Sequence, residues 1–285
     1  MNVQVIQVPY DSGHRGLRAG SGPEHLVQNG LAQTLQIEGH EVFVETVESQ
    51  TEFQAEVQTQ FELYRAIADR VAQARQDGRF PLVLSGNCGA TLGVIAGKDT
   101  KRLGVVWLDA HGEFNTHETT TSGFLDGMGL AIATGLCWAK LAASIPDFRP
   151  LPGSNVLLIG GRDFDQGGQD RLEEAGVTVV DYATLKKTSV QDALYSGLSK
   201  LVDSVDEIHV HIDPDAFDSK EAPANSYQFL AEGGMSVEQV REVIALVQKD
   251  LKITSATIAS FDPKYDPQGK TSDALFRLTN QILSP

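Results

Sequence analysis

Several apolar runs in this chain are continuous rather than alternating, for example residues 105–108 (Val-Val-Trp-Leu) and 156–159 (Val-Leu-Leu-Ile). A strand covered on one face alternates apolar and polar residues, so continuous runs indicate strands that are buried on both faces. We expect eight strands, at 2–8, 41–46, 81–86, 103–109, 155–160, 177–181, 206–213 and 253–260. A sheet buried on both faces must be covered by helices on each side.

Helical patterns lie between these runs. We expect helices at 23–37, 54–76, 89–97, 128–143, 188–203 and 236–250. The last has Ser236 at its start and Gln239 three residues later, which is a capping-box pattern. The repeated strand-then-helix order predicts an α/β protein with a mostly parallel sheet of about eight strands and helices on both faces. No linker rich in Pro, Gly or Ser divides the chain, so we expect one domain over 1–285, with its ligand site at the carboxyl ends of the strands. The loops at 160–167 and 219–235 should lie at that edge.

Composition narrows the partners and the cellular location. A net charge of −15 over 285 residues argues against nucleic acid or an anionic membrane surface as partner, but not against a small cationic substrate. Apolar runs are too short to cross a membrane, and residues 1–5 begin a strand rather than a signal peptide. Cys88 and Cys137 are too few for a disulfide framework, so we expect a cytoplasmic protein.

Two acidic clusters directly follow apolar runs, one at 109–115 (Asp-Ala-His-Gly-Glu-Phe-Asn) and one at 211–218 (His-Ile-Asp-Pro-Asp-Ala-Phe-Asp). Carboxylates crowded at the ends of buried strands repel one another and are costly to desolvate unless a cation offsets them. Alternate residues of an extended segment share a face, and the metal-ligand types alternate here: Asp109, His111, Glu113, His211, Asp213 and Asp215. The clusters therefore predict divalent ions, with Mn²⁺ best suited to the carboxylate majority. Two ions sharing carboxylates is an arrangement used for hydrolysis.

Other interpretations of these residues exist. An Asp-x-Asp turn after a strand is often a solvated loop or a helix cap. A calcium loop would end in a bidentate Glu, which is absent from this sequence. A lone His on a strand, such as His209 or His211, is more often a packed, hydrogen-bonded residue than a metal ligand. Two clusters on successive apolar strands favour metal binding over these alternatives.

Together with neighbouring motifs, the clusters resemble the arginase (ureohydrolase) superfamily. The resemblance extends along almost the whole chain and includes segments 5–10, 119–123 (Thr-Thr-Thr-Ser-Gly), 159–165 (Ile-Gly-Gly-Arg-Asp-Phe-Asp) and 233–236 (Gly-Gly-Met-Ser). It implies a three-layer α/β/α fold and a binuclear manganese site that hydrolyses a guanidine-type substrate.

The resemblance also implies a set of metal ligands. Asp109 and Asp213 would bridge the ions, and His111 and Asp215 would complete the shell of one. Glu113 would bind the other ion, whose remaining ligand in the family is a His in a Gly-Gly-Asp-His-Ser segment. Cys88 stands at that position here. A thiolate is a softer ligand, which would move the preference toward Zn²⁺ or Fe²⁺.

At three further positions the residue differs from the one that arginases have. Asp126 stands where arginases have a histidine, Ser260 stands where they have the Glu that pairs with the substrate guanidinium, and Glu113 replaces an Asp. These changes alter the residues expected around the guanidine group.

The residues expected at the other end of the substrate are retained. Asn115, Thr120 and Ser122 match positions that hold the α-carboxylate in arginases, and Asp165 matches the acid that contacts the α-ammonium. The resemblance thus implies an arginine-like amino acid as the substrate.

Within the superfamily, a cysteine ligand and the loss of the histidine are similar to the Nω-hydroxy-L-arginine hydrolases of D-cycloserine biosynthesis. This similarity implies cleavage of the guanidine C–N bond to give hydroxyurea and L-ornithine. An N-hydroxyl makes a guanidine less basic, so the substrate can bind neutral and needs no carboxylate partner. Ser260 can offer a neutral hydrogen bond instead. We expect Glu113 to pass a proton to the departing ornithine amine, and Asp126 to assist or to be only a solvated loop or cap residue.

Three rival functions remain open. An ordinary arginase or other guanidino-acid hydrolase fits the amino-acid contacts, although Ser260 and Asp126 argue against it. A metal-free thiol hydrolase would use Cys88, which follows a strand and begins a helix, where a thiolate is stabilised. A non-catalytic amino-acid sensor is the third possibility.

We also expect a monomer. A further helix at 275–283 should close the core, and the chain stops at Pro285 directly after it. A high negative charge also disfavours association of like subunits.

Overall fold

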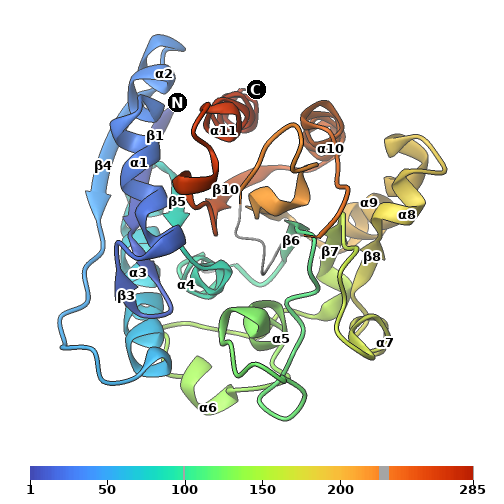
Figure 1. Cartoon of the computed structure of the whole chain (residues 1–285), viewed down its shortest axis with the longest axis horizontal. Helices are drawn as coiled ribbons and strands as arrows, with labels where there is room; N and C mark the ends of the chain where they lie inside the picture. Colours follow the sequence, from blue (N-terminus) through green and yellow to red (C-terminus); the bar gives the residue numbers. More distant parts are fainter. Residues whose placement is uncertain (99, 225–230, 285) are drawn as a thin grey trace.

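The fold is built on an eight-stranded sheet, in a computed structural model that describes residues 1–98, 100–224 and 231–284. The strand order is β4-β1-β5-β10-β9-β6-β7-β8, and every pairing in this sheet is parallel. The strands are β1 (Asn2–Val8), β4 (Glu41–Thr46), β5 (Phe80–Ser85), β6 (Leu103–Leu108), β7 (Val156–Ile159), β8 (Thr178–Val180), β9 (Glu207–Ile212) and β10 (Ile253–Ile258). All eight expected strands are confirmed: two match their expected bounds, and the other six differ by one or two residues at their ends. A two-stranded antiparallel ribbon, β2 (Tyr10–Asp11) and β3 (His14–Arg15), follows β1 (Figure 1).

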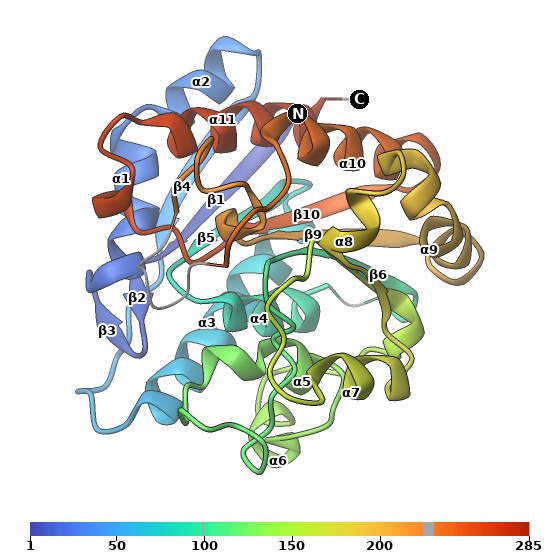
Figure 2. The same ribbon diagram turned by 45° about the vertical axis from the view of Figure 1, so that its right-hand side comes forward.

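Helices cover both faces of the sheet, so the molecule has three layers (Figure 2). One hydrophobic core joins the sheet to α1 (Gly22–Gln28), α2 (Leu31–Ile37), α8 (Tyr182–Leu185), α9 (Val190–Ser204), α10 (Val237–Asp250) and α11 (Lys270–Leu283). A second core joins the opposite face to α3 (Glu56–Gln76), α4 (Thr91–Ala96), α5 (Gly129–Ala133), α6 (Ala139–Ala142) and α7 (Gly168–Glu174). The α/β class with helices on both faces is thereby confirmed, and the sheet is wholly rather than mostly parallel.

Two of the expected helices are not continuous. The pattern at 23–37 forms α1 and α2, because Gly30 takes a left-handed conformation (φ 108°) between them. The pattern at 128–143 forms the short α5 and α6, which are separated by Gly135 (φ 85°) and Trp138 (φ 51°). The capping box of α10 is present, with Ser236 and Gln239 each bonding the backbone N–H of the other.

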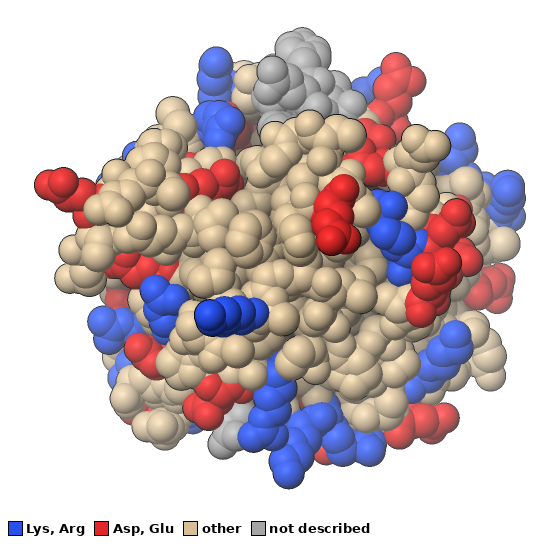
Figure 3. Space-filling view, turned by 90° about the horizontal axis from the view of Figure 1, so that it is seen from below, with Lys and Arg blue, Asp and Glu red and all other residues tan. Residues whose placement is uncertain are grey.

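The four central strands β5, β10, β9 and β6 bring their carboxyl ends together, and both acidic clusters lie at this edge. The loop at 160–167 lies there too, whereas residues 225–230 of the expected loop at 219–235 lie outside the described residues. On the face in Figure 3, acidic and basic side chains are interspersed around a centre that is neither, so the negative charge is not concentrated there. Among the described helices, none has the length and apolar character that a membrane span requires.

Candidate metal centre

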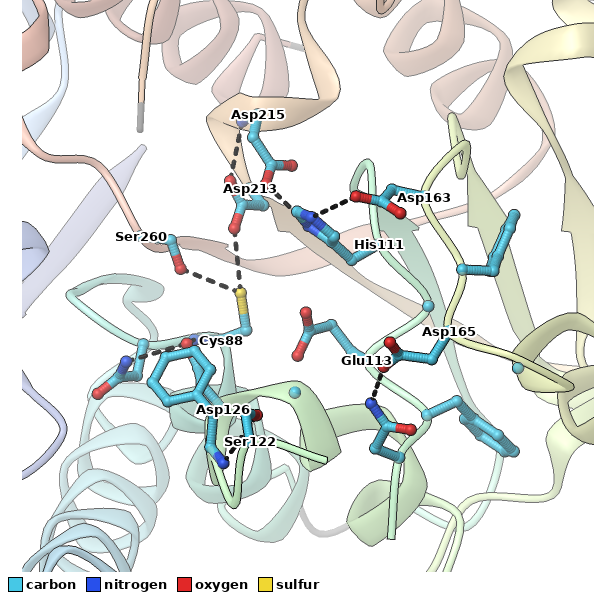
Figure 4. A pocket seen from close by; sticks show the side chains of 18 of the residues that line it. Cys88, His111, Glu113, Ser122, Asp126, Asp163, Asp165, Asp213, Asp215 and Ser260 are labelled. Atoms are coloured by element: carbon cyan, nitrogen blue, oxygen red, sulfur yellow. Dashed lines mark hydrogen bonds and ion pairs between the residues drawn. The ribbon is translucent and has the colours of Figure 1, made fainter. Parts of the chain in front are cut away.

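A cavity of about 290 Å³ opens at the carboxyl ends of the central strands. Most of the side chains that the sequence singled out line it (Figure 4): Cys88, His111, Glu113, Asn115, Ser122, Asp126, Asp165, Asp213, Asp215 and Ser260. Asp109 is fully buried and does not line the cavity. Thr120 also lies outside the lining, and its hydroxyl is 3.4 Å from Ser122 Oγ.

The two acidic clusters converge on Asp109. Its carboxylate forms one group with Asp213 and Asp215 and another with His111 and Glu113, and in each group the possible ligand atoms lie within 4.8 Å of one another. The strand register explains this convergence, because β6 and β9 are neighbours and pair Leu108 with Ile212, directly before Asp109 and Asp213. The predicted convergence is present, but its expected cause, an extended backbone, is wrong: Glu113 has a left-handed backbone (φ 49°), and Pro214–Ala216 form a short 3₁₀ helix.

Burial and mutual repulsion govern the charges of these groups. Burial, followed by the charge of Asp215, raises the pKa of Asp109 and raises that of Asp213 well above its usual value. Burial would also raise the pKa of Asp215, but His111, whose Nδ1 lies 3.0 Å from an Asp215 oxygen, outweighs it and lowers that pKa. Burial opposes charge on His111 as well, yet Asp215 and Asp109 raise its pKa well above the ordinary value. The site thus favours bound positive charge, either protons or a cation.

The carboxylate of Glu113 has the properties expected of a metal ligand. Its Oε2 atom is buried and has no hydrogen-bond partner among the described residues. Burial, with Asp109 and Asp126 nearby, raises its pKa well above the usual range. Its backbone is held at φ 49°, a left-handed conformation that is costly for a non-glycine residue and that tends to persist at functional sites. An unpaired carboxylate oxygen beside other carboxylates is the donor chemistry that a divalent cation satisfies.

Cys88 lies across the cavity from Asp165 (Figure 4). Its Sγ is 3.4 Å from Asp213 Oδ2 and 3.2 Å from Ser260 Oγ. Burial, followed by the charges of Asp213 and Asp126, raises the pKa of its thiol well above the ordinary value. The expected stabilisation of a thiolate by a helix N-terminus is therefore wrong, because burial and then the neighbouring carboxylates disfavour the thiolate. A nearby cation would reverse this effect and favour the thiolate.

The carboxylate of Asp126 accepts hydrogen bonds from residues 87–89, where the chain turns from strand to helix. Its Oδ2 accepts hydrogen bonds from Asn87 Nδ2 (2.9 Å) and Cys88 N (3.1 Å), and its Oδ1 accepts one from Gly89 N (2.9 Å). The side chain is buried, so the solvated-loop interpretation is wrong, and capping describes its contacts best. Asp126 fixes the backbone that carries Cys88.

The opposite side of the cavity holds the residues expected to contact an amino acid. Asn115 Nδ2 donates to Asp165 Oδ2, and Asn115 Oδ1 accepts from Arg171 Nη2 at 3.2 Å. Ser122 lines the cavity, and its Oγ accepts a hydrogen bond from Phe124 N at 3.2 Å. The hydroxyl of Thr120 stabilises the same turn, because its Oγ1 accepts a hydrogen bond from Gly123 N at 3.0 Å.

Arg171 was not expected from the sequence. It comes from α7, a short helix that follows the anticipated loop at 160–167, and it lines the cavity beside Asn115. A lone Arg in a charged, polar segment gives no signal by itself, and its position depends on how α7 folds back onto residues 109–115. Arg171 adds positive charge to the end of the cavity that would receive a carboxylate.

Comparisons with known proteins agree with this geometry. The model of the arginase family matches residues 1–284. The chain belongs to the arginase family. It is 28% identical over 292 residues to an arginase of Brevibacillus brevis, covering 99% of this chain and 97% of the relative. It is 26% identical over 295 residues to an arginase of Bacillus caldovelox, covering 98% and 97%.

A solved structure gives the same result for the fold. A crystal structure of arginase from Bacillus subtilis superposes with a TM-score of 0.91 at 26% identity, covering 100% of this chain and 99% of the other. The arginase-like arrangement of sheet and helices is therefore shared throughout the chain. The family resemblance inferred from the motifs is confirmed.

Proposed function

We propose that this protein is an arginase-family metallohydrolase that cleaves the guanidine C–N bond of an arginine-like amino acid. The observation behind this proposal is that one cavity holds carboxylate clusters on one side and the Asn115, Asp165 and Arg171 group on the other. The first side suits divalent cations and the second suits an amino-acid headgroup.

Two Mn²⁺ ions are the cofactors that the family implies, and the residues present fit them. Asp109 and Asp213 would be shared, His111 and Asp215 would hold one ion, and Cys88 and Glu113 would hold the other. When bound, the two ions would lower the pKa of water and stabilise negative charge in the transition state.

The amino-acid end of the substrate is held by polar groups of this chain. Arg171 and the amide of Asn115 would bind the α-carboxylate, together with Ser122 at the rim. Asp165 would bind the α-ammonium. Charge-assisted hydrogen bonds of this kind fix both position and orientation, and would place the guanidine group between Glu113 and Cys88.

The guanidine end distinguishes two candidate substrates. Relatives named arginase make L-arginine the first compound to test. Ser260 favours Nω-hydroxy-L-arginine, because its neutral hydroxyl, 3.2 Å from the Cys88 sulfur, offers no charge to a guanidinium. A less basic N-hydroxyguanidine binds neutral and needs no such partner, and its products would be hydroxyurea and L-ornithine.

Glu113 is the residue that we expect to move a proton. Its carboxylate has two oxygens, so one can bind the ion while the other carries a proton to the departing amine, and Oε2 has no hydrogen-bond partner among the described residues. Asp126 was expected to assist, but both of its oxygens accept hydrogen bonds from residues 87–89. We therefore propose that it positions Cys88 rather than transferring a proton.

Side-by-side kinetics test the proposal. Purified protein loaded with Mn²⁺ should release ornithine from at least one of L-arginine and Nω-hydroxy-L-arginine, and a chelated sample should not. A kcat/KM higher for the hydroxylated compound would favour the second substrate, and Ser260→Glu should then move the preference toward arginine. Ornithine release at full rate from metal-free protein would contradict the metallohydrolase and revive the thiol hydrolase. Metal and ligand binding without turnover would favour a sensor.

A further inference from the structure

We propose that His211 is a ligand of one metal ion, which it holds together with Cys88 and Asp109. The inference rests on the metal-binding function proposed above and adds a nitrogen donor from β9. It makes this half of the site a mixed nitrogen, sulfur and oxygen centre.

The positions of the donor atoms are the basis of the proposal. A ring nitrogen of His211, Sγ of Cys88 and a carboxylate oxygen of Asp109 all lie within 4.8 Å of one another. All three side chains are buried. His211 Nδ1 is 2.8 Å from Thr91 Oγ1, whereas its Nε2 has no hydrogen-bond partner among the described residues. Nε2 is therefore the atom left for an ion shared with Cys88 and Asp109.

The surroundings hold the ring in place. His211 stacks on Trp107, the residue paired with it on β6, with ring centroids 3.7 Å apart and an interplanar angle of 21°. The same Trp107 donates from Nε1 to Asp109 Oδ2 at 2.9 Å. One side chain thus orients two of the three donors. A metal-binding His normally makes a hydrogen bond through its second nitrogen, which fixes its tautomer, and Thr91 provides that bond here.

His209 shares the burial and the unpaired Nε2 of His211, but it has no other possible metal ligand nearby among the described residues. It lies two residues earlier on β9, is equally buried, and also has an unpaired Nε2, while its Nδ1 is 2.9 Å from Ser255 Oγ. His209 nevertheless belongs to no cluster of possible ligands among the described residues. An unpaired nitrogen alone therefore does not indicate a ligand. The proximity of Cys88 and Asp109 distinguishes His211, and His209 offers a matched control.

The donor set predicts which ion binds. A thiolate and an imidazole favour Zn²⁺ or Fe²⁺, whereas His111, Asp213 and Asp215 on the other side favour a harder ion such as Mn²⁺. We therefore expect the two positions to differ in metal preference, with the softer ion beside Cys88.

Zinc binding provides a test that does not depend on activity. Protein loaded with one equivalent of Zn²⁺ should give an X-ray absorption spectrum with one sulfur and one imidazole in the coordination shell. His211→Asn should remove the imidazole and weaken zinc binding at least 10- to 100-fold, as measured by competition with a chelating dye. His209→Asn should change neither measurement, and Cys88→Ser should remove the sulfur.

The wild-type spectrum decides the matter even if His211→Asn fails to fold. A zinc site with sulfur but without imidazole would overturn the assignment of His211 and leave the proposed hydrolase intact. An imidazole that persists in folded His211→Asn protein would also overturn it, since another His would then be the ligand. Failure of the wild-type protein to bind any divalent ion would refute both this inference and the metallohydrolase.

Discussion

Asp126→Asn is the substitution that best separates a positioning role from a catalytic one. The wild-type carboxylate accepts three buried hydrogen bonds, from Asn87, Cys88 and Gly89. An amide keeps one oxygen, so its best orientation preserves the two bonds made by Oδ2 and places its NH₂ group against the N–H of Gly89. Two buried donors then lack an acceptor, at about 1–3 kcal/mol each. Removing the charge has the opposite effect, because a buried carboxylate whose pKa is raised to about 7 destabilises the folded state when it is ionised, by about 4 kcal/mol at pH 8. The two effects are similar in size, so the expected net change in unfolding free energy is less than about 2 kcal/mol.

Thermal unfolding followed by circular dichroism measures this net change. For a chain of this size, about 2–4 °C per kcal/mol corresponds to a change in Tm of less than about 8 °C in either direction. The assay belongs at pH 8, because burial raises the pKa of Asp126 to about 7 and the carboxylate must be ionised. Asp203→Asn, an exposed change on α9, should move stability by less than about 0.5 kcal/mol. Metal content is the deciding measurement, and it should fall in Asp126→Asn because the backbone around Cys88 loses two hydrogen bonds of its support.

The opposite result would restore the catalytic role predicted from the sequence. Full metal content, together with a decrease in kcat of several orders of magnitude, would mean that Asp126 moves a proton. The positioning argument would then be wrong.

Three further predictions concern the headgroup, the metal and the assembly. Arg171→Leu should raise KM for an arginine-like substrate about 10- to 100-fold, because a charge-assisted hydrogen bond contributes about 1.5–3 kcal/mol. The same change should hardly affect the binding of agmatine, which lacks the carboxylate. Equal losses of affinity for both compounds would contradict this prediction. Cys88→His should retain two metal equivalents by elemental analysis and Cys88→Ala only one, whereas trapping a covalent intermediate on Cys88 during turnover would refute a ligand role. Light scattering should give a monomer at moderate ionic strength because of the charge of −15, and a stable trimer or hexamer would refute that prediction.

The sheet could be predicted from the sequence because its strands are continuous apolar runs. Val105–Leu108 and Val156–Ile159 are fully buried, as strands with helices on both faces must be. The helix breaks were harder to predict. An apolar period of 3.6 continues through Gly30 and Gly135, and the helices are separated by the left-handed backbone at these glycines and at Trp138.

The candidate site also contains some contacts that could be predicted from the sequence and others that could not. Asp109, His111 and Glu113 directly follow a buried strand, so their meeting at one edge of the sheet could be predicted. The left-handed backbone that turns Glu113 toward the others (φ 49°) could not. The contacts of Asp126 and Arg171 join residues that are 37 to 56 positions apart in the sequence. Such contacts depend on how loops fold over the sheet edge, and no periodicity encodes them.

The order β5-β10-β9-β6 also has a kinetic consequence. Cys88, Asp109, Asp213 and Ser260 meet only after strands from opposite ends of the chain have paired, as Leu82 does with Ala256. Bound ions would therefore stabilise the native state without helping the transition state of folding, and they should slow unfolding much more than they accelerate folding. A chelator added to folded, metal-loaded protein should shorten its lifetime in denaturant, while the rate of refolding stays nearly the same.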